Sequence, residues 1–172
     1  MNAEPIAPKI GRHMMLIAWV IGMGLLTWVF GNWEESQINP NSTPLTAKAG
    51  GVTQVTLMRN RQGHYVTSGT INQQAVTLLI DTGATTVAIP GGLQQELGLS
   101  AGTMHRSLTA NGTARAYATV VKHIAIGGIE LFNVRASILP NMPGKQILLG
   151  MSVLREIDFT QKGDKLTLRQ EH

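Results

Sequence analysis

The chain has 172 residues, of which 43% are hydrophobic and 14% are charged, with a formal net charge of +4 and no cysteine. This length suits one domain of about 100–150 residues with appendages, and a charged share below the usual ~25% indicates that part of the chain lies outside water. Without cysteine, a disulfide scaffold, a thiol protease and cysteine-ligated zinc or iron–sulfur sites are excluded. The small net charge and an aromatic content of 5% argue against a nucleic-acid partner.

Residues 14–31, MMLIAWVIGMGLLTWVFG, contain no ionisable side chain. They predict one transmembrane helix, since about 20 apolar residues at 1.5 Å rise cross a hydrocarbon core of about 30 Å. Basic residues precede this segment and Glu34 and Glu35 follow it, so the positive-inside rule places residues 1–13 in the cytoplasm. In a Gram-negative cell the chain would be a single-pass inner-membrane protein with its domain in the periplasm. A cleaved signal peptide is the alternative, but the exit sequence GNWEESQ lacks the small-x-small cleavage pattern.

Residues 32–51 are rich in Pro, Ser, Asn, Thr and Gly, which is typical of a linker that holds a domain off the bilayer. From residue 52 to residue 172, short β-rich runs alternate with turn signals, which predicts an all-β domain with one or two short helices. The expected strands are residues 52–58, 64–71, 75–80, 85–89, 106–110, 113–121, 122–126, 129–138, 147–149, 159–161 and 165–169. Short helices are expected at residues 93–97 and 151–155.

The sequence LLIDTGATT, residues 78–86, carries the chemistry. An apolar run leads directly into Asp81, which predicts a partly buried carboxylate, and Gly83 leaves its N–H free to point at that carboxylate. Two such carboxylates facing each other would share one proton. One would act as general base on a water molecule while the other, protonated, polarises the scissile carbonyl. This chemistry requires no metal ion and no organic cofactor.

Asp-Thr-Gly alone also fits an ordinary turn after a buried strand. Two further motifs follow it in order: the hairpin signal Asn111-Gly112 in LTANG, and ILLGMSVL, residues 147–154. With these motifs the chain resembles the retropepsin-like aspartic proteases, in particular the single-pass, membrane-anchored bacterial family with an Asp-Thr-Gly-Ala-Thr motif. The resemblance covers residues 62–168 and includes LLIDTGATTVAIP.

This resemblance implies a retropepsin-like acid protease barrel and a role for individual residues. Asp81 matches the catalytic aspartate, the Thr82 hydroxyl would bond to the opposite loop across a dimer, and Gly83 would supply a supporting amide. The hairpin would be a flap that closes over bound peptide, although it could be a hairpin tip without a lid function. The residues implied for substrate binding are Ala84, Thr109, Ala110, Asn111 and Gly112, and those implied for support of the active-site loop are Ile147, Leu148, Leu149 and Gly150.

Only one Asp-Thr-Gly is present, whereas the mechanism requires two carboxylates. Asp158 and Asp164 lack a following Ser/Thr-Gly, and we interpret both as solvated turn residues. The second carboxylate must therefore come from a second copy, which predicts a symmetric homodimer. By resemblance, residues 52–57 and 166–169 are the candidate interface strands.

Two function classes remain open. The first is a membrane-anchored aspartic endopeptidase that acts on a protein or peptide. The second is a catalytically idle, membrane-tethered module that binds peptides or dimerises with the same fold. The intact motif favours the first, because a binding module gains nothing from a buried carboxylate pair. Ser152 resembles a nucleophile-elbow serine but lacks the second glycine, so we interpret it as a helix-start residue.

Overall fold

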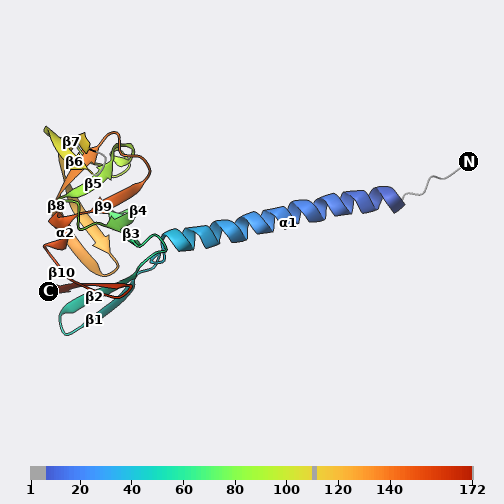
Figure 1. The fold of residues 1–172 in the computed structure, drawn as a ribbon, viewed down its shortest axis with the longest axis horizontal. Coiled ribbons are helices and arrows are strands. Elements are labelled where there is room, and N and C mark those ends of the chain that lie inside the picture. The colour runs from blue at the N-terminus through green and yellow to red at the C-terminus, as the bar shows by residue number, and fades with distance from the viewer. Residues whose placement is uncertain (1–6, 110–111, 172) are drawn as a thin grey trace, which may run out of the picture. The chain divides into compact units, whose positions relative to one another are not determined.

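A computed structural model describes residues 7–109 and 112–171, and the chain divides into residues 1–37 and residues 38–172. The first unit is helix α1 (Ala7–Ile38), drawn in blue in Figure 1. Its residues from Gly11 to Ile38 contain a window of mean hydropathy 2.0 that is not buried, so by length and composition this helix could cross a membrane. It extends beyond the expected end at residue 31, because the next helix-breaking residue is Pro40.

Residues 32–51, expected to be a linker, contain regular secondary structure. Their first part continues α1, and their last part contains strand β1 (Leu45–Ala49), which pairs antiparallel with β2 (Val52–Met58). Gly50 and Gly51 form the turn between them with φ values of 59° and 78°, as a two-residue hairpin requires. A segment rich in Ser, Thr and Pro therefore belongs to the folded domain, because its strand is formed by pairing with β2 and not by its own propensity.

Asn41, between the helix and β1, is 4% exposed. Its side chain donates to the carbonyls of Met58 and Val66 at 2.8 and 2.7 Å, and accepts from the Met58 amide at 2.6 Å. Its backbone carbonyl accepts from Ser68 and from the Thr67 hydroxyl, both at 3.1 Å. The folded domain consequently begins at about Ile38 and not at residue 52, because the hydrogen bonds of Asn41 attach this segment to β2 and β3.

Seven strands form a barrel that confirms the expected all-β fold. They run in the order β3-β4-β9-β5-β8-β7-β6, and an additional pairing of β3 with β7 closes six of them, while β6 extends the sheet beyond β7. The side chains that fill it are fully buried and include Leu78, Ile89, Ile124 and Leu149. The strands are β3 (Tyr65–Ile71), β4 (Gln74–Ile80), β5 (Val87–Pro90), β6 (Met104–Thr109), β7 (Gly112–Ile126), β8 (Ile129–Leu139) and β9 (Gln146–Leu149).

Strand β7 is one continuous element of 15 residues where the sequence predicted two strands, 113–121 and 122–126. Its residues from Tyr117 to Ile126 pair with β8, and this ladder continues on both sides of the expected break between Val121 and Lys122. The two short helices are the 3₁₀ turn η1 (Gly91–Leu93) and helix α2 (Met151–Leu154). Leu93 and Leu97 are 6% and 1% exposed, so they share one buried face as expected, although hydrogen-bonded turns replace the α-helix there.

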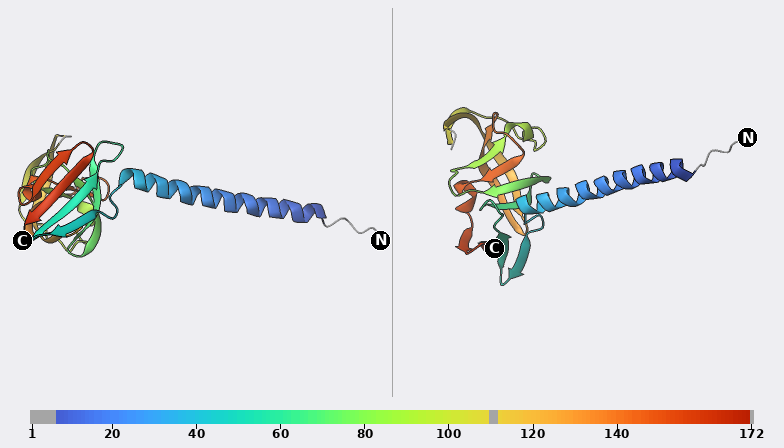
Figure 2. Two further views of the ribbon diagram at one scale, coloured as in Figure 1. Left: turned by 90° about the horizontal axis from the view of Figure 1, so that it is seen from below. Right: turned by 45° about the vertical axis from the view of Figure 1, so that its right-hand side comes forward.

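A separate four-stranded antiparallel sheet has the order β1-β2-β11-β10, with β10 (Asp158–Lys162) and β11 (Lys165–Glu171) from the C-terminal end. Figure 2 shows the strands from the two ends of the domain side by side, in teal and red. The candidate interface strands, residues 52–57 and 166–169, lie in β2 and β11 at the centre of this sheet. The expectation that these strands offer a free edge to a second copy is wrong, because both already have neighbours on two sides. The open edges of the sheet are β1 and β10.

Candidate active site

Asp81 lies directly after β4, at the start of a tight loop. Its backbone N–H donates to the Leu149 carbonyl of β9 at 3.0 Å, so the loop begins where two strands end together. The side chain is half-buried, and the Gly83 amide donates to its Oδ1 at 2.9 Å. A Cβ on Gly83 would lie 3.2 Å from the same oxygen, tighter than ordinary contact. A glycine at this position therefore lets the amide approach the carboxylate.

The loop is held from behind by Gly150 and the start of α2. A Cβ on Gly150 would lie 2.5 Å from the Thr86 carbonyl oxygen and 2.6 Å from that of Ala84, so only glycine fits between the two segments. The amides of Met151 and Ser152 donate to the carbonyls of Ala84 and Thr85 at 2.8 and 3.0 Å. The structure therefore brings the ILLG segment and the Asp-Thr-Gly-Ala-Thr loop together.

The side chains of the supporting strand differ in burial. Ile147 and Leu149 are fully buried in the core, whereas Leu148 between them is partly exposed. Ser152 lies in α2, where its hydroxyl accepts from the Val87 amide at 3.2 Å and donates to the Arg135 carbonyl at 3.3 Å. Ser152 therefore links α2 to β5 and β8 by hydrogen bonds. This structural role agrees with its interpretation as a helix-start residue and not with that of a nucleophile.

A chain of side-chain contacts joins the active-site loop to the hairpin strand β6. The Thr86 and Ser137 hydroxyl oxygens are 3.3 Å apart, and the Ser137 hydroxyl lies 3.3 Å from His105 Nε2. Ser137 is 4% exposed. No local signal in the sequence indicates this connection, because Ser137 is 51 residues from Thr86 and 32 from His105.

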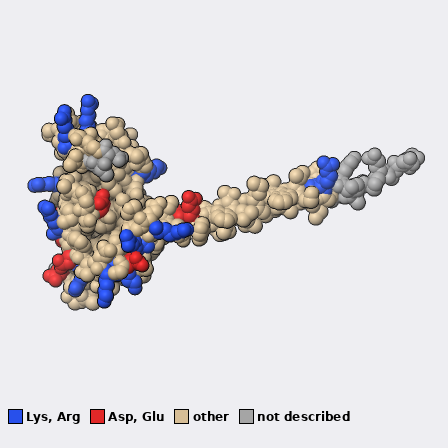
Figure 3. Space-filling model, in the orientation of Figure 1, with Lys and Arg blue, Asp and Glu red and all other residues tan. Residues whose placement is uncertain are grey.

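The expected flap is an antiparallel hairpin of β6 and β7, with Thr109 paired to Gly112. Gly112 has φ +100°, while Ala110 and Asn111 lie outside the described residues. Leu108 is 87% exposed, and Arg106 lies directly opposite Arg115. Figure 3 shows basic side chains over the part of the domain where Figure 1 places these two strands. The hairpin is thus joined to the rest by its strand pairing and projects apolar and basic groups into solvent.

Thr82, the residue after Asp81, is exposed. The other two aspartates, Asp158 and Asp164, belong to the β10–β11 hairpin of the four-stranded sheet. Asp164 lies in the β10–β11 turn, 78% exposed and 3.9 Å from Arg59, as expected of a solvated turn residue. Asp158 is also exposed, but it begins β10 and is not a turn residue. The described chain therefore places a single aspartate, Asp81, at the loop.

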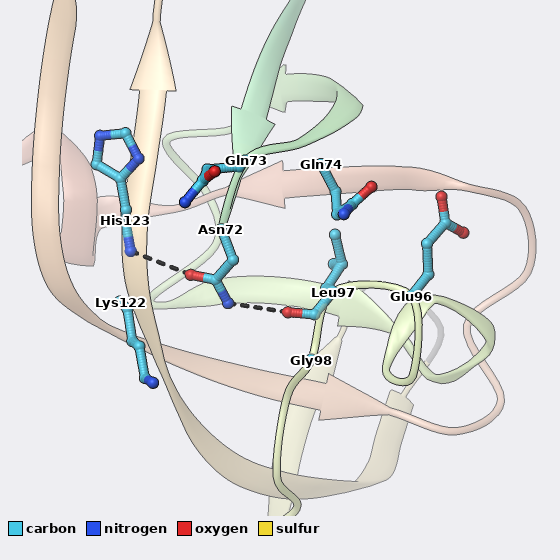
Figure 4. Close-up of a pocket in the computed structure, with 8 residues that line it drawn as sticks. All are labelled: Asn72, Gln73, Gln74, Glu96, Leu97, Gly98, Lys122 and His123. Atoms are coloured by element: carbon cyan, nitrogen blue, oxygen red, sulfur yellow. Dashed lines mark hydrogen bonds between the residues drawn. The ribbon is translucent and has the colours of Figure 1, made fainter.

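A polar pocket of about 340 Å³ lies at the opposite end of β4 from Asp81 (Figure 4). Asn72 joins two of the segments that line this pocket: its side chain donates to the Leu97 carbonyl at 2.9 Å and accepts from the His123 amide at 3.2 Å. Asn72 and Gln73 form a two-residue turn with φ values of 48° and 71°. Because seven strand residues span about 20 Å, this pocket is not part of the Asp81 site. Its lining residues are Asn72, Gln73, Gln74, Glu96, Leu97, Gly98, Lys122 and His123.

Comparison with known proteins identifies relatives of this arrangement. Residues 67–156 match the family described as "gag-polyprotein putative aspartyl protease". A retropepsin-like aspartic protease from Rickettsia conorii is similar in structure, with a TM-score of 0.57 and 25% identity over 74% of this chain and 94% of that one. The EIAV protease in complex with the inhibitor HBY-793 gives a TM-score of 0.46 at 22% identity, over 58% of this chain and 92% of that one.

A curated relative is the uncharacterised protein in the cobV 5′ region of Sinorhizobium sp. It is 30% identical over 144 residues, which are 81% of this chain and 62% of the relative. The match therefore spans about three fifths of the length of that protein. The family match extends from Thr67 in β3 to Glu156, so it includes the Asp81 loop, the hairpin and Gly150.

Proposed function

Because this chain belongs to the retropepsin-like aspartic proteases, we propose that it is an aspartic endopeptidase that hydrolyses peptide bonds with Asp81. The observation that carries the proposal is the Asp81 loop, where a half-buried carboxylate accepts the Gly83 amide at 2.9 Å and is held from behind by Gly150. A loop held in this way fixes the direction of the carboxylate before substrate arrives. Catalytic groups that are already oriented need no reorganisation during the reaction.

The chemistry requires two facing carboxylates that share one proton. The ionised one takes a proton from a water molecule, whose oxygen attacks the scissile carbonyl, while the protonated one donates to the carbonyl oxygen. Collapse of the tetrahedral intermediate breaks the C–N bond as the amide nitrogen receives a proton. Each carboxylate alternates between acid and base, and the only other reactant is water.

Each chain supplies one Asp-Thr-Gly, so we propose that the active enzyme is a homodimer with one Asp81 from each copy. Thr82 is exposed in the single chain, which is consistent with a hydroxyl that bonds to the opposite loop. The hairpin of β6 and β7 would close over an extended peptide and exclude water, with Ala84, Thr109, Ala110, Asn111 and Gly112 as the residues nearest the substrate. Ile147, Leu148, Leu149 and Gly150 would support the loop.

We further propose that α1 anchors the enzyme in the inner membrane through residues 14–31, with residues 1–13 in the cytoplasm and the protease domain in the periplasm. The supporting observations are an exposed apolar helix and the basic residues that precede it. Two copies in one membrane would meet at a raised effective concentration, which favours pairing. A reporter that is active only outside the cytoplasm, fused after residue 172, should be active; a signal only from a cytoplasmic reporter would reverse the topology.

The activity is tested with the full chain in detergent and an unfolded protein substrate between pH 4 and 8. Asp81→Asn should abolish cleavage and leave the thermal unfolding temperature nearly unchanged, whereas Asp164→Asn, at an exposed turn, should cleave like the wild type. Pepstatin should inhibit the wild type. Cleavage that survives Asp81→Asn would refute the proposal, and no cleavage by any variant would favour the idle peptide-binding or dimerisation module.

A mixing experiment separates a shared site from a self-sufficient one. Excess Asp81→Asn chain, allowed to exchange subunits with the wild type, should suppress activity, because nearly every wild-type chain would then pair with an inactive partner. Heterodimer formation is followed independently with two affinity tags. Full activity despite demonstrated heterodimers would show that one chain suffices.

A further inference from the structure

We propose that the outer face of the β6–β7 hairpin, formed by Arg106, Leu108, Thr113 and Arg115, binds an acidic segment of the protein substrate outside the bond that is cleaved. This inference rests on the proposed function, since it assigns a substrate class to the same enzyme. It uses a group of charges that the chemistry proposed for Asp81 leaves without a role.

The two faces of the hairpin differ in burial. Successive side chains of a strand point to opposite sides, so Arg106 and Leu108 share one face and His105 lies on the other. The His105 face turns toward the barrel, because His105 Nε2 is 3.3 Å from the buried Ser137 hydroxyl and the cross-strand neighbour Ala116 is fully buried. All four residues of the outer face are exposed, Leu108 to 87%. The outer face is therefore open to a partner.

Two arginines lie side by side on this face without a compensating acid. Arg106 is directly opposite Arg115 in the strand register, a spacing at which like charges repel. The sequence between Glu96 and Glu130 contains no Asp or Glu. Within residues 7–109 and 112–171, neither guanidinium group makes an ion pair. An anion that contacts both guanidinium groups would relieve this repulsion, so the face favours a negatively charged partner.

The side chains of the outer face fit a carboxylate that lies close to an apolar group. Arginine presents a planar fork of donors that binds a carboxylate through two parallel hydrogen bonds. Leu108 lies two residues from Arg106 on the same strand, which is a separation of about 7 Å. An extended polypeptide with alternating acidic and apolar residues carries its carboxylates and apolar groups at this same spacing. The outer face therefore fits an acidic peptide segment.

Other anionic partners fit this face less well. Nucleic acids are bound by many cations together with aromatic side chains for stacking, whereas the outer face has two cations and no aromatic residue. An anionic bilayer is bound by clusters of about four to eight Lys or Arg. A protein segment requires only the contacts that the face offers, and a protein is the partner that the proposed activity already brings to the hairpin.

The outer face would add a charge preference that the proposed substrate cleft lacks. The residues proposed to lie nearest the substrate, Ala84, Thr109, Ala110, Asn111 and Gly112, are all uncharged. In the part of the chain that the structure describes, β6 ends the strand order of its sheet and has no neighbouring strand on its outer side. A substrate that leaves the cleft past this edge can place its next residues on the outer face.

Binding is tested with the full chain in detergent and two dye-labelled peptides, one of alternating Glu and Leu and one of alternating Gln and Leu. The chain carries Asp81→Asn, so that binding is measured by fluorescence anisotropy without cleavage. The acidic peptide should bind about fivefold more tightly, because two exposed ion pairs contribute a modest gain. Raising the salt concentration from about 0.05 M to about 0.5 M should remove most of this difference.

Substitution of both arginines tests the location. Arg106→Gln/Arg115→Gln should remove the preference for the acidic peptide without lowering the unfolding temperature, because it removes a repulsive pair. Arg61→Gln/Arg169→Gln removes two exposed arginines elsewhere, with the same change of net charge, and should keep the preference. Equal binding of both peptides before these substitutions, or the same loss in both double variants, would overturn the inference. So would protection of the β6 and β7 amides from hydrogen exchange by phosphatidylglycerol but not by the acidic peptide, which would assign the face to lipid.

Cleavage kinetics give an independent measurement. With an unfolded protein substrate, Arg106→Gln/Arg115→Gln in the otherwise wild-type chain should raise the KM about fivefold and leave kcat nearly unchanged, because the outer face holds a part of the substrate away from the reacting bond. Conversion of the substrate's carboxylates to methylamides should raise the KM of the wild type similarly and have no further effect in the variant. An unchanged KM in the variant would contradict the inference.

The outcomes distinguish this inference from the proposed function. A preference for the acidic peptide without any cleavage by the wild type would leave the outer face as a binding site and refute the endopeptidase. Cleavage that requires Asp81 but depends neither on the two arginines nor on the substrate's carboxylates would refute the outer-face inference alone.

Discussion

The Asp81 loop and the β6–β7 hairpin are held in different ways. Backbone groups of Ala84, Thr85 and Thr86 meet Gly150 and α2 at close contact distances, and these contacts lie against the buried core. The hairpin is held by its strand pairing, with a contact of His105 to Ser137, and it exposes Leu108 almost completely. Segments with few buried contacts open locally at low free energy cost. The Asp81 carboxylate is thus on the rigid part, and the hairpin, which we propose closes over the substrate, is the loosely held part.

The largest effect is expected when the rigid part is broken. Gly150→Ala inserts a methyl group 2.5–2.6 Å from two carbonyl oxygens, so α2 and the Asp81 loop must separate. Overpacking of this kind costs about 1–3 kcal/mol, and the displaced carboxylate should remove most activity. The measurements are thermal unfolding and peptide cleavage. Gly92→Ala is the control, because nothing lies within 4 Å of its added Cβ; equal effects of both substitutions would refute the close-packing explanation.

The buried side chain of Asn41 holds the start of the domain by three hydrogen bonds, and its loss should have the next largest effect. Asn41→Ala leaves the Met58 amide and the carbonyls of Met58 and Val66 without this partner, which should lower the free energy of unfolding by about 2–4 kcal/mol. The exposed neighbour Ser42→Ala should change it by less than about 0.5 kcal/mol. Denaturant unfolding of the full chain measures both. If Asn41→Ala is as stable as Ser42→Ala, residues 38–44 behave as the linker that composition suggested.

A smaller effect is expected from a substitution at Ala84, which should change the pH dependence of cleavage. Ala84 has no donor, whereas a serine hydroxyl there could donate a hydrogen bond to the ionised carboxylate and favour the charged form. The base would then be available at lower pH, so the pH–rate profile of Ala84→Ser should move down by about half to one unit. Ala101→Ser, at an exposed position, should leave it in place. A profile that is unchanged or moves upward would contradict this expectation.

The smallest effect is expected in the hairpin. Arg106→Glu replaces the repulsive pair with Arg115 by an attractive one and should stabilise the local pairing by about 0.2–1 kcal/mol. Hydrogen exchange of the β6 and β7 amides should slow, while the global unfolding temperature barely changes. Arg61→Glu makes the same charge change in an exposed turn and should not affect these amides. Slower exchange in both variants would indicate a general charge effect.

Local chemistry made much of the fold predictable. Period-two alternation and paired turn residues located most strands to within one or two residues, and the turns at Gly127-Gly128 and Gly163-Asp164 connect the expected partners. The run LLIDTGATT predicted a half-buried aspartate with a glycine amide beside it, and the structure has this contact at 2.9 Å. These features depend on neighbours within a few residues, so the sequence contains their causes directly.

Partners far apart in the chain were decided by tertiary packing alone. The segment with Asn41 and β1 reads as a linker because its own composition favours no strand, and it becomes ordered only by bonding to Met58, Val66 and β2. β2 and β11 pair across more than 100 residues, for example Val55 with Leu168, and this pairing leaves β10 as the open edge. The contacts of Ser137 with Thr86 and with His105 also join residues far apart in the chain, so only tertiary packing decides them. The sequence by itself determined the Asp81 loop, the alternating strands and the apolar helix, because these need only local periodicity. Which strands pair, where the barrel closes and which edge stays open depend on the burial of all strands at once, and only the assembled structure decides them.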